Sequence, residues 1–178
     1  MRMAEDLARE EVTEEEISLF KPPFKAGDPV WDFELSDMEG RKVKLSDYKG
    51  KVILLFFFAT WCPYCSAEAP YLEKEVWQKL RDKGVQVITV DIKEGKDLVD
   101  KMIKRFGWTM PVLFDIDGAV ADRFAPHMEG LSPEVAIINA HFIIDKEQRI
   151  RSYDYLNMEK FDAHARRVIR MLEQALKE

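Results

Sequence analysis

The order of apolar segments along the chain predicts an α/β fold with a central mixed β-sheet flanked by helices. Segment 52–58 is entirely apolar and segment 85–90 is mostly so, which is typical of strands that helices cover on both faces. A segment with helical spacing of apolar residues separates them, as expected of a parallel strand–helix–strand unit. Near the C-terminus, two apolar segments joined by a short turn precede a last stretch of helical spacing. They add an antiparallel pair and a closing helix.

The composition is that of one folded domain with an apolar core. The 178 residues are 47% hydrophobic and 34% charged, with a net charge of −6. No basic cluster indicates nucleic-acid binding. The longest apolar run, 52–59, has eight residues, whereas a membrane helix needs roughly 20, so no membrane span is expected. The opening MRMAEDLAREE lacks the apolar core of a signal peptide, so we expect a cytoplasmic protein.

Residues 1–24 differ in composition from the rest, and we expect a helical N-terminal extension ahead of a domain at residues 25–178. The segment holds seven acidic and three basic residues. Thr13 and Glu16 have the spacing of a capping box, which predicts a short helix, and a pair of prolines ends it. Two interpretations are open at this point: a solvated tail, or a helix that docks on the domain or on a partner.

A hairpin and a helix are expected on either side of the first apolar strand. Segment 31–35 alternates apolar and polar residues, as a half-buried strand does, and 41–45 pairs with it across a turn at 38–40. Segment 67–81 has apolar residues at helical spacing. Gly84 ends that helix, because glycine tolerates the left-handed conformation of a helix C-terminus.

The remaining elements follow from the same two periodicities and from the positions of Pro and Gly. They are a helix at 98–106, a short strand at 112–114, a brief helix at 118–124, a long strand at 135–144, its antiparallel partner at 148–155 and a closing helix at 158–176. The antiparallel pair follows the parallel strands in the chain, which gives the mixed sheet.

The chain has only two cysteines, Cys62 and Cys65, and both lie where the first apolar strand passes into the first helix. The N-terminus of a helix presents unpaired N–H groups and a partial positive charge, which favour a thiolate. Pro63 suits the first helical turn, because its missing N–H is not needed there. Cys65 lies one turn further on and should be more buried and less acidic. The pattern predicts thiol–disulfide exchange, in which the Cys62 thiolate attacks a disulfide and Cys65 then releases the product.

A metal site is an alternative that the same two thiolates offer, because they supply half of a tetrahedral zinc shell. Further ligands would have to come from His127, His141 or His164, and none has ligand spacing to another His or Cys. His141 lies inside an apolar segment and is expected to be a hydrogen-bonded core histidine. We expect no metal and no cofactor beyond a redox-active Cys62–Cys65 disulfide, with a metal- or cluster-binding module kept as an alternative.

The motif and its flanks resemble the thioredoxin superfamily. They are most similar to the TlpA/ResA-like thiol–disulfide oxidoreductases, with kinship to the peroxiredoxin (AhpC/TSA) branch. The resemblance rests on WDFELSDMEGRKVKLSDYKGK, VILLFFFATWCPYCSAEAP, MPVLFDIDGAVADRF and FIIDKEQRI, which together span roughly residues 26–155. It implies a thioredoxin-like fold, with Cys62 as the nucleophile and Cys65 as the resolving thiol. It also implies protein disulfides as substrates, reduced with electrons from a donor that the sequence does not identify.

The same resemblance assigns roles to the neighbours of the cysteines. Trp61, Pro63 and Tyr64 are expected to lie along the substrate groove. Glu68 occupies the place of an acid that tunes and shuttles the cysteine proton in the ResA-like branch. A partly buried carboxyl group with a raised pKa is suited to that role.

One position departs from the family's pattern. The family places a cis-proline opposite the two cysteines, six residues before the aspartate that ends the FIID-type strand. Counting back from Asp145 gives Asn139, whereas Pro133 lies twelve residues before that aspartate. Either Asn139 takes the place with a trans bond, or an insertion at 126–138 moves the proline to Pro133. Both are candidate groove residues, and the departure strengthens the metal alternative.

A thiol peroxidase is the other alternative. Aligned through Glu68, the peroxidatic cysteine of peroxiredoxins falls on Cys65, and their motif threonine falls on Cys62. Their motif proline falls on Phe58. The peroxide-binding set is therefore incomplete, and disulfide exchange is the favoured function.

Overall fold

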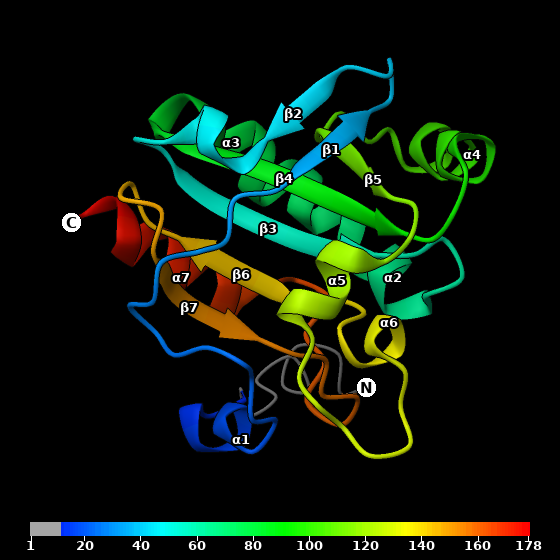
Figure 1. Ribbon diagram of the computed structural model, residues 1–178. Helices are drawn as coiled ribbons and strands as arrows, with labels where there is room; N and C mark the ends of the chain where they lie inside the picture. The colour runs from blue at the N-terminus through cyan, green and yellow to red at the C-terminus, as the bar shows by residue number, and fades with distance from the viewer. Residues whose placement is uncertain (1–11) are drawn as a thin grey trace, which may run out of the picture.

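A computed structural model describes residues 12–178, in which a seven-stranded mixed sheet carries helices on both faces (Figure 1). The strand order is β2-β1-β5-β4-β3-β6-β7. The strands are β1 (Glu34–Asp37), β2 (Lys42–Lys44), β3 (Val52–Phe58), β4 (Val85–Ile92), β5 (Val112–Asp115), β6 (His141–Ile144) and β7 (Ile150–Asp154). The helices are α1 (Glu14–Ser18), α2 (Pro63–Tyr71), α3 (Gln78–Leu80), α4 (Lys96–Phe106), α5 (Ala119–Phe124), α6 (Pro133–Ala136) and α7 (Arg166–Leu176). The predicted fold class is confirmed.

Strands β3 and β4 form the centre of the sheet, and every residue of both is buried. They run parallel, in register from Val52 opposite Val85 to Phe58 opposite Asp91, while β6 pairs antiparallel with the other edge of β3. Each large apolar side chain that is fully buried contributes roughly 1.5–3 kcal/mol. The run of phenylalanines at 56–58 therefore anchors the strand end from which the CxxC segment begins.

The first helix is longer than predicted and is not uniform. It begins at Pro63 instead of residue 67 and continues through α2, a π-helical stretch (Leu72–Trp77), α3 and a 3₁₀ turn (Arg81–Lys83). Pro70 lies inside α2, where it removes one backbone donor, and the π-helical stretch follows directly. Gly84 ends the helix with a φ of +100°, as predicted.

The N-terminal hairpin is present: its first strand begins three residues later than predicted, and its second lies within the predicted range 41–45. Its strands β1 and β2 pair antiparallel around a turn that includes Gly40. The Asp37 carboxylate accepts the N–H groups of Glu39 and Arg41, both at 2.9 Å, and so fixes the turn. The other edge of β1 pairs with β5, which joins the hairpin to the main sheet.

The prediction of one long strand at 135–144 is wrong in its first half. Pro133 occupies the first turn of the short helix α6, and strand β6 begins only at His141. Asn139, with a φ of +62°, turns the chain between them. An apolar run of this length does not distinguish a strand from a buried helical turn, and proline at a helix start was the overlooked signal.

The closing helix also begins later than predicted, at Arg166 instead of residue 158. In the preceding segment two side chains compete with helix formation. Asn157 accepts the N–H groups of Glu159 and Lys160 at 3.1 and 3.2 Å. Asp162 likewise accepts that of His164 at 3.0 Å. The segment 155–165 is thus a series of turns that packs beside α2. The predicted elements α4, β5, α5 and β7 are confirmed.

The described part of the N-terminal extension is a helix docked on the domain. Thr13 and Glu16 form the predicted capping box. Ile17 is buried, and Glu16 forms an ion pair with Lys160 at 2.8 Å. Residues 1–11 of the expected extension lie outside the described residues. The boundary between residues 24 and 25 stays a prediction.

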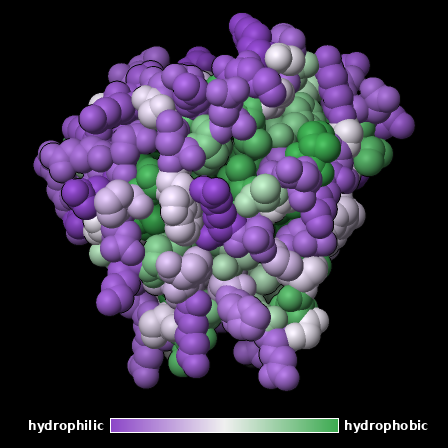
Figure 2. All heavy atoms as spheres, viewed as in Figure 1, coloured by the Kyte–Doolittle hydropathy of each residue, from purple (hydrophilic) through white to green (hydrophobic). Residues whose placement is uncertain are grey.

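Hydrophilic side chains cover most of the face seen in Figure 2, with hydrophobic atoms visible in patches between them. Within residues 12–178, no helix has both the length and the apolar character that a membrane crossing requires.

Candidate active site

Cys62 occupies the position just before the first turn of α2, at the carboxyl end of β3. Its backbone is extended, and Pro63 follows as the first helical residue. The Cys62 sulfur accepts the backbone N–H of Cys65 at 3.2 Å, which is the capping contact that a side-chain oxygen usually makes. The strand–helix junction therefore aims the free N–H groups of the helix at one sulfur atom.

The two thiols differ in acidity, in the order that the sequence predicted. The hydrogen bond from the Cys65 side chain, with the backbone N–H groups of Cys65 and Tyr64, lowers the pKa of Cys62 against the opposing effect of burial. Burial raises the pKa of Cys65 well above its usual value, and the neighbouring Cys62 raises it further. Cys62 is therefore the thiol that ionises first, and Cys65 has to lose its proton before it can react.

Glu68 lies one turn beyond Cys65 on the buried side of α2, and only 2% of its surface is exposed. Its Oε2 atom accepts a hydrogen bond from the Asn139 amide at 3.0 Å and lies 2.8 Å from Nε2 of His141. Burial raises the pKa of Glu68, while the positive charge of His141 opposes the rise. Glu68 is thus a buried carboxyl group held by two side chains, and not a helix-surface glutamate.

Of the two candidate groove residues near the strand β6, Asn139 is the one beside the dithiol. Its Nδ2 atom lies 3.8 Å from the Cys65 sulfur, within reach of a weak N–H···S hydrogen bond, and its backbone N–H bonds to Phe57 of β3 at 3.0 Å. Asparagine tolerates the left-handed backbone found here better than most residues do. Pro133 begins α6 and lines a separate hollow with Trp31. No peptide bond is cis among residues 12–178.

The three residues expected along the groove differ in exposure. Trp61 is 57% exposed and Pro63 is also exposed, so both lie on the surface on either side of Cys62. Tyr64 is half-buried, and its ring contacts that of Phe161 at 4.9 Å in an edge-to-face arrangement. The apolar rim next to Cys62 therefore consists of Trp61 and Pro63, while Tyr64 joins α2 to the 155–165 segment.

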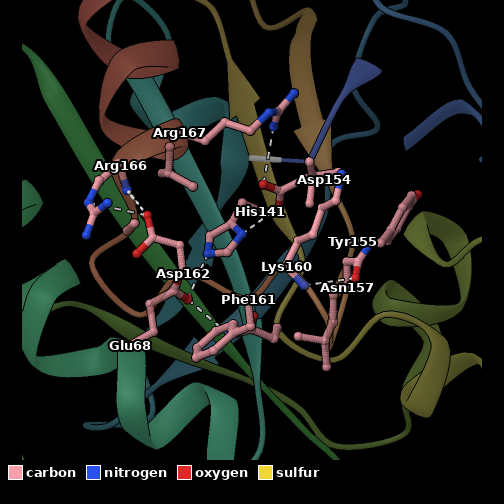
Figure 3. Close-up of a pocket in the computed structure, with 15 residues that line it drawn as sticks. Glu68, His141, Asp154, Tyr155, Asn157, Lys160, Phe161, Asp162, Arg166 and Arg167 are labelled. Carbon is pink, nitrogen blue, oxygen red and sulfur yellow. Dashed lines mark hydrogen bonds and ion pairs between the residues drawn. The ribbon is translucent and has the colours of Figure 1, made fainter. Parts of the chain in front are cut away.

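Two further site residues are His141, which the sequence offered only as a distant metal ligand or a core histidine, and Asp154, which it did not single out. His141 is buried, as expected of a core histidine, but its two ring nitrogens contact two different acids: Glu68 at 2.8 Å and Asp154 at 2.6 Å. Figure 3 shows the imidazole between the two carboxylates, with Arg167 beyond Asp154 at 3.3 Å. The available signal was the hairpin register, which places His141 directly opposite Asp154.

The loop that precedes Cys62 is held by a second acidic group. Glu94 accepts the backbone N–H of Thr60 at 2.6 Å and its hydroxyl at 2.5 Å. The N–H of Glu94 in turn bonds to Asp91, at the end of β4, at 3.2 Å. Asp91 is fully buried, and its second oxygen is without a hydrogen-bond partner among the described residues.

The geometry of the site bears on the metal-binding and peroxidase alternatives. Within residues 12–178, no group of three or more His, Cys, Asp or Glu side chains is arranged to hold a metal ion. The cysteine that aligns with the peroxidatic residue of peroxiredoxins is Cys65, whose pKa burial raises. A peroxidatic thiol has to be ionised, so the site favours Cys62 as the reactive thiol and not Cys65.

Comparisons with known proteins agree with this geometry. The family model described as the AhpC/TSA family matches residues 26–153. The thiol–disulfide oxidoreductase ResA of Geobacillus thermodenitrificans (strain NG80-2) is 34% identical over 142 residues, which are 80% of this chain and 76% of that protein. ResA of Bacillus subtilis (strain 168) is 31% identical over 144 residues, 79% of each chain.

Solved structures give the same result. A putative protein disulfide isomerase from Bacteroides thetaiotaomicron superposes with a TM-score of 0.74 at 28% identity, over 89% of this chain and 94% of that one. A putative thiol:disulfide interchange protein DsbE from Chlorobium tepidum gives 0.65 at 25% identity, over 84% and 99%. The chain therefore belongs to the AhpC/TSA family, with the thioredoxin-like fold, among the ResA-type thiol–disulfide oxidoreductases.

Proposed function

We propose that this protein reduces disulfide bonds in other proteins by cycling Cys62 and Cys65 between dithiol and disulfide. The observation that carries the proposal is the contact of the Cys62 sulfur with the N–H of Cys65 at the start of α2. Together with the hydrogen bond from the Cys65 side chain, this contact lowers the pKa of Cys62, and the second thiol lies within one helical turn of the first. The neighbouring residues Glu68, Trp61 and Pro63 are proposed to act on this pair or on its substrate.

The reaction takes place in two displacements. In the first, the Cys62 thiolate attacks one sulfur of the substrate disulfide. A Cys62–substrate disulfide forms, and the other substrate sulfur leaves as a thiolate. In the second, Cys65 loses its proton and attacks the Cys62 sulfur, so that the Cys62–Cys65 disulfide forms and the remaining substrate thiolate leaves. Two electrons pass to the substrate, and a separate dithiol donor of unidentified nature restores the starting state.

Glu68 is the acceptor for the Cys65 proton in this proposal. The Asn139 amide contacts both the Cys65 sulfur and Glu68 Oε2, which places the carboxyl group next to the resolving thiol. A carboxyl group whose pKa is raised toward neutrality exchanges protons more readily at physiological pH than an ordinary surface glutamate.

The surface around Cys62 favours a protein partner. Cys62 itself is nearly inaccessible, whereas Trp61 beside it exposes 57% of its surface. An exposed tryptophan next to a reactive atom supplies the aromatic contact that is enriched in protein–protein interfaces. Trp61 and Pro63 are therefore the proposed first contacts of a substrate.

Replacement of Cys65 by serine tests the proposal. The Cys65→Ser variant keeps the nucleophile but lacks the resolving thiol, so a disulfide-bonded substrate should remain attached as a stable mixed disulfide on Cys62. Peptide mapping after non-reducing electrophoresis locates the adduct. The matched Cys62→Ser variant should trap little or nothing, because the pKa of Cys65 is raised. Equal trapping by both variants, or none by either, would refute the assignment.

A further inference from the structure

A row of three titratable side chains leads from the resolving cysteine into the interior. Glu68 comes from α2, His141 from β6 and Asp154 from β7. The two contacts in the row measure 2.8 and 2.6 Å, and the side chains of Glu68, His141 and Asp154 are only 2%, 5% and 14% exposed. Figure 3 shows the imidazole ring bridging the two acids. Buried charges are costly unless they are paired, so this arrangement requires a reason.

Two carboxyl groups on opposite sides of the ring favour the charged form of His141. A neutral imidazole has one donor and one acceptor nitrogen, so it would turn a lone pair toward one of the two carboxylates. An imidazolium donates from both nitrogens, and both contacts then become charge-assisted hydrogen bonds. Burial by itself lowers the pKa of His141, but Glu68 and Asp154 outweigh it and raise the pKa to about 10.

We propose that His141 is a positioning residue for the second displacement: as an imidazolium it holds the Glu68 carboxylate beside Asn139 and Cys65, ready to accept the Cys65 proton. This inference rests on the proposed function and deepens it. The hydrogen bond from His141 fixes the Oε2 atom of Glu68, and the positive charge restrains the rise in its pKa that burial causes. Asp154 fixes the ring from the other side.

A cavity lies beside the row. Its volume is about 60 Å³, and its walls include Glu68, His141 and Asp154 together with residues of the 155–165 segment. A water molecule occupies about 30 Å³ in the liquid, and polar partners are present on several sides. The lining also includes residues 166–168 at the start of α7, so Glu68 has space for water beside it on that side.

The groups that face the row come from every element packed against it. Cys62 and Cys65 lie on the same helix as Glu68, and Asp154 faces it from β7. Lys160, Asp162, Arg166 and Arg167 line the cavity, and Glu16 and Glu14 of α1 pair with Lys160 and Arg167. Within this set His141 is the cation in direct contact with Glu68, so its removal should act on Glu68 first.

The test measures the two displacements separately in one trace. A bis(nitrobenzoate) disulfide, used in excess over the reduced protein, releases one coloured thiolate when Cys62 attacks. It releases a second when Cys65 resolves the adduct. In His141→Gln we expect the second release to slow by about tenfold or more near neutral pH, and its pH profile to change shape. The first release should stay within about twofold, because Cys62 keeps its contact with the helix start.

His164→Gln is the matched control. His164 also packs on α2, with its ring 4.2 Å from that of Tyr71, but it is not part of the row. Both releases should be unchanged in this variant. Should His141→Gln fold poorly, as judged by its melting transition, Asp154→Asn keeps the imidazole and should slow the second release by a smaller factor.

The outcomes separate the two proposals. A normal second release in the folded His141→Gln and Asp154→Asn variants, with an unchanged pH profile, would overturn the role of His141 alone. Equal slowing of both releases would also overturn it, because a general loss of structure affects both steps. The absence of a first release from Cys62 in the unmodified protein would instead refute the proposed function.

Discussion

Glu68 of α2 and Asp91 of β4 are two buried carboxyl groups with different surroundings. Glu68 has a cation, His141, at 2.8 Å and an amide, Asn139, at 3.0 Å. Asp91 has another acid, Glu94, as its neighbour, and one of its oxygens has no hydrogen-bond partner among the described residues. Burial, followed by the effect of Glu94, raises the pKa of Asp91 to about 8.

The difference shows how one fold keeps two buried acids in different states. Among residues 12–178 no cation contacts Asp91, and its raised pKa of about 8 keeps it largely protonated at neutral pH. Through Glu94 it supports the Thr60 loop as a structural group. Glu68 is held by the imidazolium, so its charge is partly compensated and its proton can move. Desolvation raises the pKa of both carboxyl groups, and the charge of the neighbouring side chain then opposes that rise or adds to it.

The largest expected effect that tests this comparison is the contribution of His141 to the pH dependence of the free energy of unfolding. Its folded pKa of about 10 lies above the unfolded value of 6.5. The contribution of the imidazolium is therefore complete below about pH 6.5 and is lost as pH rises toward 10. Since one pKa unit corresponds to about 1.4 kcal/mol, the loss is on the order of 5 kcal/mol.

Urea unfolding of the reduced protein at several pH values between about 6 and 10 measures this loss. His141→Gln serves as the reference, because the other titrating groups remain in it. The free energy of unfolding of the unmodified protein should fall more steeply with pH than that of the variant. Parallel pH dependences would mean that His141 is not charged in the folded state, and the contrast with Asp91 would disappear.

The next effect concerns Asp91: stability again falls as pH rises, but here removal of the ionisable group should stabilise the fold. The folded pKa of about 8 lies above the unfolded value of 3.8, so Asp91 lowers stability progressively as pH rises from about 4 to 8. Asp91→Asn removes the ionisation, so we expect it to raise the free energy of unfolding at pH 8 by clearly more than the roughly 0.5 kcal/mol of an ordinary surface substitution. Near pH 4 the gain should vanish.

Thermal or urea unfolding of Asp91→Asn at both pH values checks this expectation. Asp97→Asn on the exposed face of α4 is the control and should change stability by less than about 0.5 kcal/mol at either pH. A destabilised Asp91→Asn variant at pH 8 would mean that Asp91 is ionised and usefully paired in the fold, which is the state assigned here to Glu68.

Much of the fold could be predicted, because its elements are set by local periodicity. The apolar run of β3 and the spacing within α4 identified a buried strand and an amphipathic helix. The errors lie where a side chain overrides that periodicity. Asn157 and Asp162 bond to nearby N–H groups and delay the start of α7. Such competition depends on tertiary placement and leaves a weak trace in the sequence.

The site was predictable only as far as its chemistry is local. The positions of Cys62 and Cys65 at a helix start follow from four consecutive residues. The contact of Glu68 with His141 joins residues 73 positions apart, and that of His141 with Asp154 depends on a strand register. His141 was expected to be a satisfied core residue. Its ring is hydrogen-bonded as expected, but its two partners are acids, and these contacts are the basis of the positioning role proposed for it.

The smallest expected effect is that of Glu14→Gln, which tests whether the row of Glu68, His141 and Asp154 extends to the N-terminal helix. Arg167 contacts Asp154 at 3.3 Å and also Glu14 of α1 at 2.5 Å, so a continuous set of ion pairs reaches the N-terminal helix. The Glu14 side chain is 85% exposed, and exposed ion pairs contribute little because water screens them. Glu14→Gln should therefore lower the melting temperature by no more than about 1 °C. It should leave the second thiolate release unchanged, since Arg167 still faces Asp154. A slowed second release in this folded variant would show that the helix α1 acts on the resolving step, and the row would then extend from Cys65 to the surface of the extension.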